Sequence, residues 1–183
     1  QILRDGTAGQ SPDTIEQVVQ RALVRAHGMR KLISDLLDLT RIESGQKRRE
    51  FGPIDFREIA QNALDGVAQA AEAREIALEL HAPERVAAVA DRGEIEIIFN
   101  NLVSNAVKYN RDGGRIELRT RQADGLSWLD VTDTGQGLTT AQLAHLFEPF
   151  NRLGAERSNV SGTGIGLLIT RQLVLAVGCR LAV

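Results

Sequence analysis

The stretch Asn101-Leu-Val-Ser-Asn-Ala-Val-Lys-Tyr109 decides how the rest of this 183-residue chain is interpreted. Its apolar residues continue a helical pattern that begins at Asp91, a residue type that often caps helices. Asn101 and Asn105 are four residues apart, so a helix places both carboxamides on one face. Amide oxygens suit Mg²⁺, and Lys108 lies one turn further along, where it can meet a phosphate. The stretch favours a metal and phosphate site, although such an asparagine pair alone more often faces water or caps a turn.

A second motif, Asp133-Thr-Gly-Gln-Gly137, follows a strand pattern. A carboxylate only accepts hydrogen bonds, so the aspartate suits the exocyclic amino group of adenine. Gly135 and Gly137 have no Cβ, which lets the backbone lie close to a flat base or adopt a positive φ. Taken alone, this motif is also compatible with an ordinary turn.

A third motif, Gly162-Thr-Gly-Ile-Gly166, opens another helical pattern. Free N–H groups and the helix dipole attract phosphate at such a position. The motif is neither a Walker loop nor a dinucleotide-binding fingerprint, and alone it is equally compatible with a glycine hinge. Together, and in this order, the three motifs indicate an ATP site.

A long segment separates the two glycine motifs, and it contains Leu146-Phe-Glu-Pro-Phe-Asn-Arg-Leu153. Loops of this length are usually functional. A lid over a nucleotide would use Phe147 and Phe150 as anchors and Arg152 to reach a terminal phosphate. The alternative is that the phenylalanines, Phe147 above all, pack in the core.

The composition excludes several classes of protein. Hydrophobic residues make up 43% of the chain and aromatic residues 4%, which predicts a sizeable aliphatic core. The net charge of −2 and the pI near 6.0 argue against a nucleic-acid partner. The single cysteine, Cys179, forms no internal disulfide and indicates a reducing, cytoplasmic setting. No apolar run approaches the roughly 20 residues of a membrane span.

The N-terminal region predicts one long helix with a coiled-coil seam. Ser11 and Pro12 suit its N-cap and first position, and the pattern stops at Ser44-Gly45. A seam this narrow needs a partner helix, which we expect a second copy of the chain to supply. The polar run 46–50 marks a domain boundary near residue 50. The seam residues are Ile15, Val19, Ala22, Ala26, Met29, Ile33, Leu36, Leu39 and Ile42.

The remaining periodicity predicts alternating helices and strands. Both ends of the chain look cut, and 179–183 resembles the start of a strand, so we expect a fragment of a longer protein. The predicted elements are a helix at 57–74, strands at 76–80 and 86–90, a helix from 91 to 107, a turn at 112–114, paired strands at 116–121 and 127–132, and a helix at 166–177.

These motifs resemble those of a known family, the sensor histidine kinases of the GHKL superfamily. Residues 101–109 resemble its N box, and 133–137 resemble its first glycine box. Residues 147–150 resemble the F box, and 162–167 the second glycine box. Upstream, 32–45 is similar to the end of the family's dimerisation hairpin. The resemblance covers nearly the whole chain.

The resemblance implies an α+β fold. It is a two-layer α/β sandwich of the GHKL ATPase type, in which a mixed sheet has helices on one face, preceded by a long coiled-coil-type dimerisation helix. Residues 1–49 would be a partial dimerisation and phosphoacceptor hairpin, and 50–183 an ATP-binding catalytic domain that lacks its C-terminal strand. The implied partners are a second copy of the chain and the receiver domain of a response regulator, with no nucleic acid. Any membrane attachment would come from regions outside this chain.

The resemblance also implies roles for individual residues. Asn105 would coordinate Mg²⁺, Asp133 would hold adenine, and Lys108 and Arg152 would be the catalytic contacts to the transferred phosphate. The lid would span 137–162. The implied nucleotide-binding residues are Asn101, Asn105, Lys108, Tyr109, Asp133, Gly135, Gly137, Phe150, Arg152, Gly162, Thr163, Gly164, Ile165, Gly166 and Leu167.

By this resemblance, the γ-phosphate of ATP moves to a histidine and then to an aspartate of a response regulator. His27, His81 and His145 all lack the flanks of a phosphoacceptor, so that histidine is expected outside this chain. Hydrolases of the superfamily carry a glutamate where this chain has Asn101, which favours transfer over hydrolysis. The alternatives are a silent ATP-binding interaction module and, less favoured, a GHKL ATPase.

Overall fold

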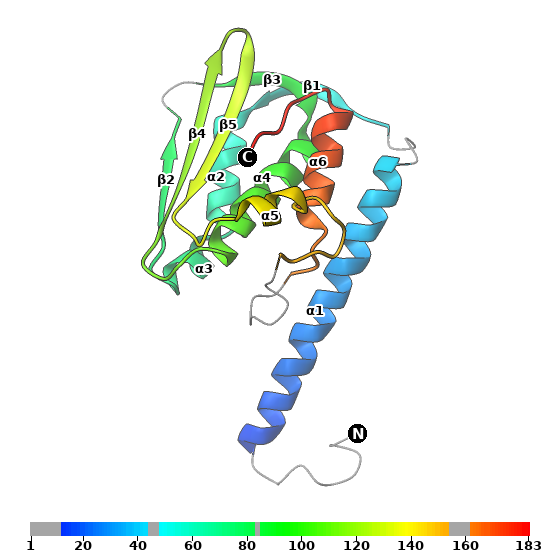
Figure 1. Ribbon diagram of the computed structural model, residues 1–183, viewed down its shortest axis with the longest axis vertical. Helices are drawn as coiled ribbons and strands as arrows, with labels where there is room; N and C mark the ends of the chain where they lie inside the picture. Colours follow the sequence, from blue (N-terminus) through cyan, green and yellow to red (C-terminus); the bar gives the residue numbers. More distant parts are fainter. Residues whose placement is uncertain (1–11, 44–47, 83–84, 154–161) are drawn as a thin grey trace.

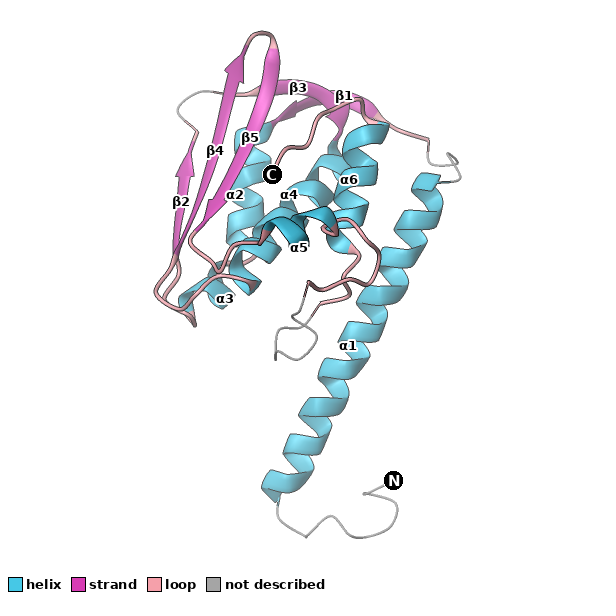
Figure 2. Ribbon diagram, viewed as in Figure 1, coloured by secondary structure: helices cyan, strands magenta, loops and turns pink. Residues whose placement is uncertain are grey.

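The computed structural model describes residues 12–43, 48–82, 85–153 and 162–183. A long helix projects from a domain in which strands and helices form two layers (Figure 1, Figure 2). In chain order, the elements are α1 (Pro12–Glu43), β1 (Phe51–Asp55), α2 (Phe56–Asp65), α3 (Ala68–Glu72), β2 (Ala77–His81), β3 (Ala87–Asp91), α4 (Arg92–Lys108), β4 (Arg115–Ala123), β5 (Leu126–Asp133), α5 (Thr140–Ala144) and α6 (Gly166–Ala176).

Helix α1 confirms the long helix that the seam predicts. It begins at Pro12 and runs for 32 residues, while Ser11 and 44–45 lie outside the described residues. Its C-terminal part lies beside α6, where Leu32 packs against the domain core (Figure 1). Seam residues such as Met29 and Ile33 are more than half exposed. Among the described helices, none is long and apolar enough to cross a membrane.

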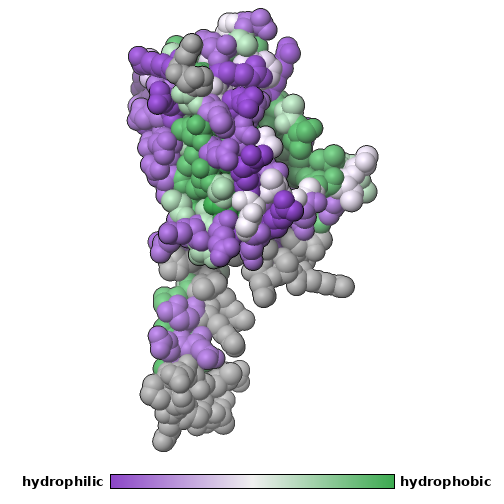
Figure 3. All heavy atoms as spheres, turned by 90° about the vertical axis from the view of Figure 1, so that its left-hand side faces the viewer, coloured by the Kyte–Doolittle hydropathy of each residue, from purple (hydrophilic) through white to green (hydrophobic). Residues whose placement is uncertain are grey.

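The strands form a mixed sheet and a separate ribbon. β2 pairs with β4 in parallel, and β4 pairs with β5 antiparallel, which confirms the paired strands predicted at 116–121 and 127–132. β1 and β3 form a two-stranded antiparallel ribbon. On β4, Ile116 and Leu118 point into the core, whereas Glu117 and Arg119 alternate onto the outer face. Figure 3 shows the sheet side of the molecule, which is mostly hydrophilic.

Helices α2, α4 and α6 cover the inner face of the sheet, which confirms the two-layer sandwich (Figure 1). The buried core is largely aliphatic, as the composition predicts. Its one fully buried aromatic ring, among the described residues, is Phe99 of α4, which packs edge-to-face on Phe56 at 5.3 Å between ring centroids. Ile59 of α2 and Ile169 of α6 are equally inaccessible. The core therefore centres on α4, which lies between α2 and α6 and also packs against β5.

The single helix predicted at 57–74 is wrong. The structure divides it into α2 and α3, with Gly66 as the C-cap of α2. Glycine is a poor helix former, and here its N–H bonds back to the carbonyl of Asn62 and closes the last turn. The break places Ala71 of α3 in the core and leaves the neighbouring Ala70 exposed.

Three further expectations need correction. Strand β1 was not predicted, because Gly52-Pro53 is typical of a turn. Proline is tolerated in β1 because, among the described strands, β1 pairs only with β3. Residues 179–183 form no strand, because they pair with none of the described strands. The lid is not wholly irregular, because Thr139 and Gln142 form a capping box that starts α5.

A buried ion pair fastens the segment before β1 to the start of α4. Arg49 donates from Nε to both carboxylate oxygens of Glu94, at 3.1 and 3.0 Å. Glu94 is fully buried, whereas the Arg49 side chain is 25% exposed. A buried carboxylate is costly to leave without its cation. This contact therefore keeps the chain entering the domain in a fixed place.

We expect Arg49→Ala to lower the free energy of unfolding by about 3 kcal/mol, because Glu94 loses a cation that compensates its burial. Arg85→Ala is the matched control. Arg85 pairs with Asp55 at 3.6 Å and is 72% exposed, so its loss should cost less than about 1 kcal/mol. Chemical denaturation of both variants measures the difference. Equal stability of the two variants would contradict the structural role of Arg49.

Candidate nucleotide site

Helix α4 presents a polar stripe beside its buried face. Asp91 caps the helix by accepting from the N–H of Glu94 at 3.0 Å, as the sequence predicts. Asn101, Asn105 and Lys108 are half-buried and follow one another at helical spacing. The core residues anchor the adjacent side of the helix, so the stripe is held at a fixed depth.

The first asparagine of the stripe joins α4 to α6. Asn101 Nδ2 lies 3.2 Å from the carbonyl of Gly166 and 3.5 Å from Oγ1 of Thr170. The Thr170 hydroxyl donates in turn to the same carbonyl, at 3.0 Å. By contrast, Asn105 makes no side-chain hydrogen bond within the described part of the chain. Asn101 therefore links α4 to α6, a contact that Asn105 does not share.

The end of α4 is fixed from outside the motif. Arg74, which follows α3, donates to the carbonyls of Val107 and Asn110, both at 2.6 Å. A cation that binds carbonyls at a helix C-terminus also interacts favourably with the helix dipole. Lys108 and Tyr109 lie between those two carbonyls, so Arg74 sets their position. The role of Arg74 was not predicted, because no local pattern links this residue to the end of α4, which comes much later in the sequence.

The first glycine motif packs on the end of α4. Asp133, exposed at the end of β5, accepts from the N–H of Gly135 at 2.7 Å through Oδ1. A Cβ on Gly135 would lie 2.5 Å from the carbonyl oxygen of Tyr109, so only glycine fits. Gln136 N–H approaches the same carbonyl at 3.4 Å. Gly137 has φ +65°, which confirms the positive φ expected there.

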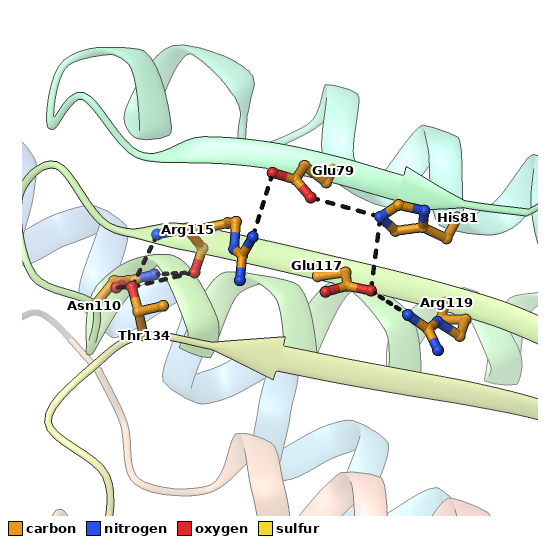
Figure 4. Close-up of polar contacts among 7 residues, drawn as sticks. All are labelled: Glu79, His81, Asn110, Arg115, Glu117, Arg119 and Thr134. Carbon is orange, nitrogen blue, oxygen red and sulfur yellow. Dashed lines mark hydrogen bonds and ion pairs between the residues drawn. The ribbon is translucent and has the colours of Figure 1, made fainter.

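Thr134 and Asn110 tie this motif to the segment before β4 (Figure 4). Thr134 Oγ1 accepts from the N–H of Arg115 at 2.9 Å and donates to Asn110 Oδ1 at 3.1 Å. Asn110 Nδ2 donates to the carbonyl of Arg115 at 3.1 Å. Asn110 is buried, so this network holds the aspartate motif rigidly against the end of α4. No local pattern predicts this network, because Asn110, Arg115 and Thr134 meet only when the chain folds.

The second glycine motif lies against the lid. Gly164 has φ +72°, and a Cβ there would lie 2.9 Å from the carbonyl carbon of Phe150. Phe150 N–H donates to the carbonyl of Gly164 at 3.1 Å. Gly162 is more open: the nearest atom to a Cβ built on it is the Tyr109 hydroxyl oxygen, at 3.9 Å. The glycine motif thus touches both the lid and the end of α4.

The same motif leads into α6. Thr163 Oγ1 accepts from the N–H of Ile165 at 3.4 Å. Ile165 is fully buried and Leu167 is half-buried, so these two residues seat the start of α6 in the core. Their backbone, and not their side chains, is what the motif can offer to a phosphate.

The lid folds around α5 and the two phenylalanines. Phe147 is half-buried below the guanidinium of Arg171, which lies 5.1 Å from the ring centroid. Phe150 is 58% exposed, so it is not a core residue, and Arg152 is half-buried. Figure 1 shows α5 crossing between the sheet and α1. Residues 154–161 lie outside the described part, so the full lid span of 137–162 is not followed.

The structure thus brings the motifs into one neighbourhood. Tyr109 is the meeting point: its carbonyl touches the first glycine motif, and its hydroxyl lies near the second. Phe150 joins the second glycine motif to the lid. Thr170, which binds with Asn101, was missed by the sequence analysis, although its place four residues after Gly166 is a usable signal.

A separate polar cluster lies on the outer face of the sheet (Figure 4). Among the described residues, Glu79, His81 and Glu117 form one group whose side chains could hold a metal ion. Arg119 donates to Glu117 at 2.7 Å, and this hydrogen bond holds the pKa of Glu117 below its usual value. Arg115 lies 3.9 Å from Glu79. Because the arginines balance both carboxylates, the cluster is explained as a surface ion-pair network.

Comparison with known proteins supports one family. A family model described as histidine kinase-, DNA gyrase B- and HSP90-like ATPase matches residues 90–183, just over half of the chain. The alginate biosynthesis sensor protein KinB of Pseudomonas aeruginosa is 30% identical over 153 residues. That alignment covers 83% of this chain but only 25% of KinB, so this chain spans a quarter of that relative's length.

Solved structures show the same fold. ShkA in complex with AMPPNP has a TM-score of 0.74 at 24% identity, covering 92% of this chain and 35% of ShkA. The histidine kinase ThkA in complex with the response regulator protein TrrA has a TM-score of 0.67 at 19% identity, covering 85% and 46%. This chain belongs to the histidine kinase-, DNA gyrase B- and HSP90-like ATPase family. Within that family, it is homologous to sensor histidine kinases over their catalytic ATP-binding domain.

We expect Gly164→Ala to destabilise the domain by about 1–3 kcal/mol, because alanine must adopt a positive φ and its Cβ meets backbone atoms of Phe150. Gly162→Ala is the matched control in the same motif. Its site is open and has no positive φ, so we expect a loss of no more than about 0.5 kcal/mol. Thermal denaturation without nucleotide measures both variants. A Gly164→Ala variant as stable as Gly162→Ala would show that the contact with the lid is absent in solution.

Proposed function

We propose that this chain is the ATP-binding catalytic part of a sensor histidine kinase that transfers the γ-phosphate of ATP to a histidine outside this chain. The phosphate would then pass to an aspartate in the receiver domain of a response regulator. Family membership and the homology to KinB support the class of protein. The convergence of the three motifs around Tyr109 supports the site.

In this proposal, the stripe on α4 holds the phosphates and the metal. Asn105 suits Mg²⁺ because its half-buried carboxamide has no hydrogen-bond partner among the described residues. Lys108 supplies positive charge one turn further along. Bound Mg²⁺ would neutralise charge on the phosphates. The backbone of the second glycine motif, at the start of α6, adds N–H donors.

Asp133 is the residue proposed to recognise adenine. Its Oδ1 already accepts from Gly135, whereas Oδ2 makes no hydrogen bond within the described part of the chain. That oxygen can accept from the amino group of the base. The close packing of Gly135 on Tyr109 leaves no side chain to interfere with a flat ring.

The carboxylates of α4 bear on whether the site would transfer the γ-phosphate to a protein or hydrolyse ATP. The helix has two carboxylates, Glu94 and Glu96, and both are engaged in its first turns. Glu94 is fully buried against Arg49, and Glu96 accepts from Arg92 at 2.8 Å. Glu96 lies on the side of the helix opposite Asn105, and Glu94 lies about three helical turns before Asn105, so neither carboxylate can serve as general base for a water near Asn105. What the site can do is position the phosphates and balance their charge, which is the main requirement of phosphoryl transfer.

Two protein partners are proposed for this chain: a second copy of itself and a receiver domain. The exposed apolar seam of α1 is proposed to pair with a second copy of the chain, which would form a homodimer. A receiver domain is proposed as the second partner, because the relative ThkA is seen in complex with a response regulator protein.

Asp133→Asn should weaken ATP binding about tenfold or more, because the charged acceptor for the base is lost. Asp130→Asn is the matched control on the same strand. Asp130 pairs with Arg121 at 3.2 Å on the outer face, so its loss should leave ATP affinity within about twofold. Isothermal titration calorimetry with ATP and Mg²⁺ measures both. Equal affinities for the two variants would remove Asp133 from the site.

The longer protein that carries the acceptor histidine should form an acid-labile, base-stable label with γ-labelled ATP. Asn105→Ala in that protein should abolish the label, because the proposed metal ligand is lost. Asn100→Ala, on an exposed neighbouring position of α4, is the control and should keep it. Rapid ATP hydrolysis without phosphohistidine would instead favour an ATPase. ATP binding with neither activity would favour a silent module.

A further inference from the structure

A chain of hydrogen bonds through the side chains of His145, Glu148 and Asn151, here called the brace, links the end of α5 to Leu153. His145 Nδ1 lies 2.6 Å from Glu148 Oε1. The other oxygen of Glu148 accepts from Asn151 Nδ2 at 2.8 Å. Asn151 Oδ1 accepts in turn from the N–H of Leu153 at 2.9 Å. The hydrogen bond from His145, followed by that from Asn151, holds the pKa of Glu148 below its usual value, so this carboxylate is ionised at neutral pH.

Two side chains hold the backbone of Leu153, one through its N–H and one through its carbonyl. Leu153 donates its N–H to Asn151, and its carbonyl accepts from Gln142 Nε2 at 2.6 Å. Gln142 is itself fixed, because it forms the capping box of α5 with Thr139. Both ends of the brace are therefore anchored to the same short helix, and the chain between them forms a closed loop.

The backbone inside this loop takes an unfavourable conformation. Phe150 has φ +63° and Leu153 has φ +55°, in the left-handed region that glycine favours and other residues avoid. Such residues persist only where the surroundings hold them, and they gather at functional sites. The two strained residues enclose Asn151 and Arg152. The brace holds the Leu153 side of Arg152, and the hydrogen bond from Phe150 N–H to the carbonyl of Gly164 holds the other side.

We propose that His145 is a positioning residue: through Glu148 and Asn151 it fixes the backbone around Arg152 and so directs the guanidinium toward the terminal phosphate. This inference rests on the proposed function, in which Arg152 contacts the γ-phosphate. His145 itself touches no nucleotide. Its role is to keep Glu148 turned toward Asn151, which then fixes the Leu153 peptide.

The proposal predicts a selective loss. ADP has no γ-phosphate, so a misplaced Arg152 should weaken ATP binding and leave ADP binding unchanged. We expect His145→Ala to weaken ATP binding about fivefold to tenfold, because a hydrogen bond to a charged group is displaced. ADP affinity should stay within about twofold of the wild type, which also reports that the variant is folded.

Three further variants sharpen the test. His145→Asn places an amide nitrogen near the position of Nδ1 and should restore the ATP preference. Glu148→Gln removes the charge at the centre of the brace and should reproduce the selective loss. His81→Ala removes an exposed histidine on the outer face of the sheet and should change neither affinity.

Combining His145→Ala with Arg152→Ala tests the route of the effect. If His145 acts through Arg152, the double variant should bind ATP no more weakly than Arg152→Ala alone. Isothermal titration calorimetry with ATP and ADP in Mg²⁺ provides every value. An unchanged ATP-to-ADP affinity ratio in His145→Ala, or an additive loss in the double variant, would overturn the role of His145. A wild-type chain that binds neither nucleotide would overturn the proposed function itself.

Discussion

The dual role of helix α4 is the constraint on which the rest of the structure depends. One side of the helix carries buried residues such as Phe99 and Val103, and the adjacent stripe carries Asn101 and Asn105. Because a helix repeats every 3.6 residues, the two sets cannot move independently. Any shift that exposed the core side would also misplace the stripe. The buried pair of Arg49 with Glu94 fixes one end of this helix, and the carbonyl contacts of Arg74 fix the other.

The candidate site is assembled mainly from backbone. Gly135 meets the carbonyl of Tyr109, Gly164 meets the backbone of Phe150, and the start of α6 is held through the carbonyl of Gly166. Contacts of this kind demand glycine at two places and leave little freedom for the loops. They bring N–H groups and a few side chains into one neighbourhood around Tyr109. Such a site suits a reaction in which the protein positions phosphates and balances charge and makes no covalent bond itself.

The backbone of the lid is held in a different way. Its conformation is not given by glycine, because Phe150 and Leu153 hold positive φ angles with ordinary side chains. Polar side chains from α5 to Asn151 supply the compensation; His145 and Glu148 are exposed, whereas Gln142 and Asn151 are half-buried. Exposed hydrogen bonds are individually weak, so this part of the domain is held less firmly than the core. A lid held by weak, separable contacts can be adjusted without disturbing α4.

The sequence by itself determined the features that repeat or occur locally. Helical spacing set the stripe on α4 and the length of α1, the Asp91 cap marked the start of α4, and the three motifs predicted a nucleotide site and indicated the family. Tertiary structure alone decided which distant groups meet. Arg74 on the end of α4, the bond from Asn101 to α6, the pairing of β1 and the brace at His145 depend on contacts that no local pattern encodes. Periodicity indicates which face of a helix or strand is buried, whereas the residues that this face contacts are determined only when the elements pack together.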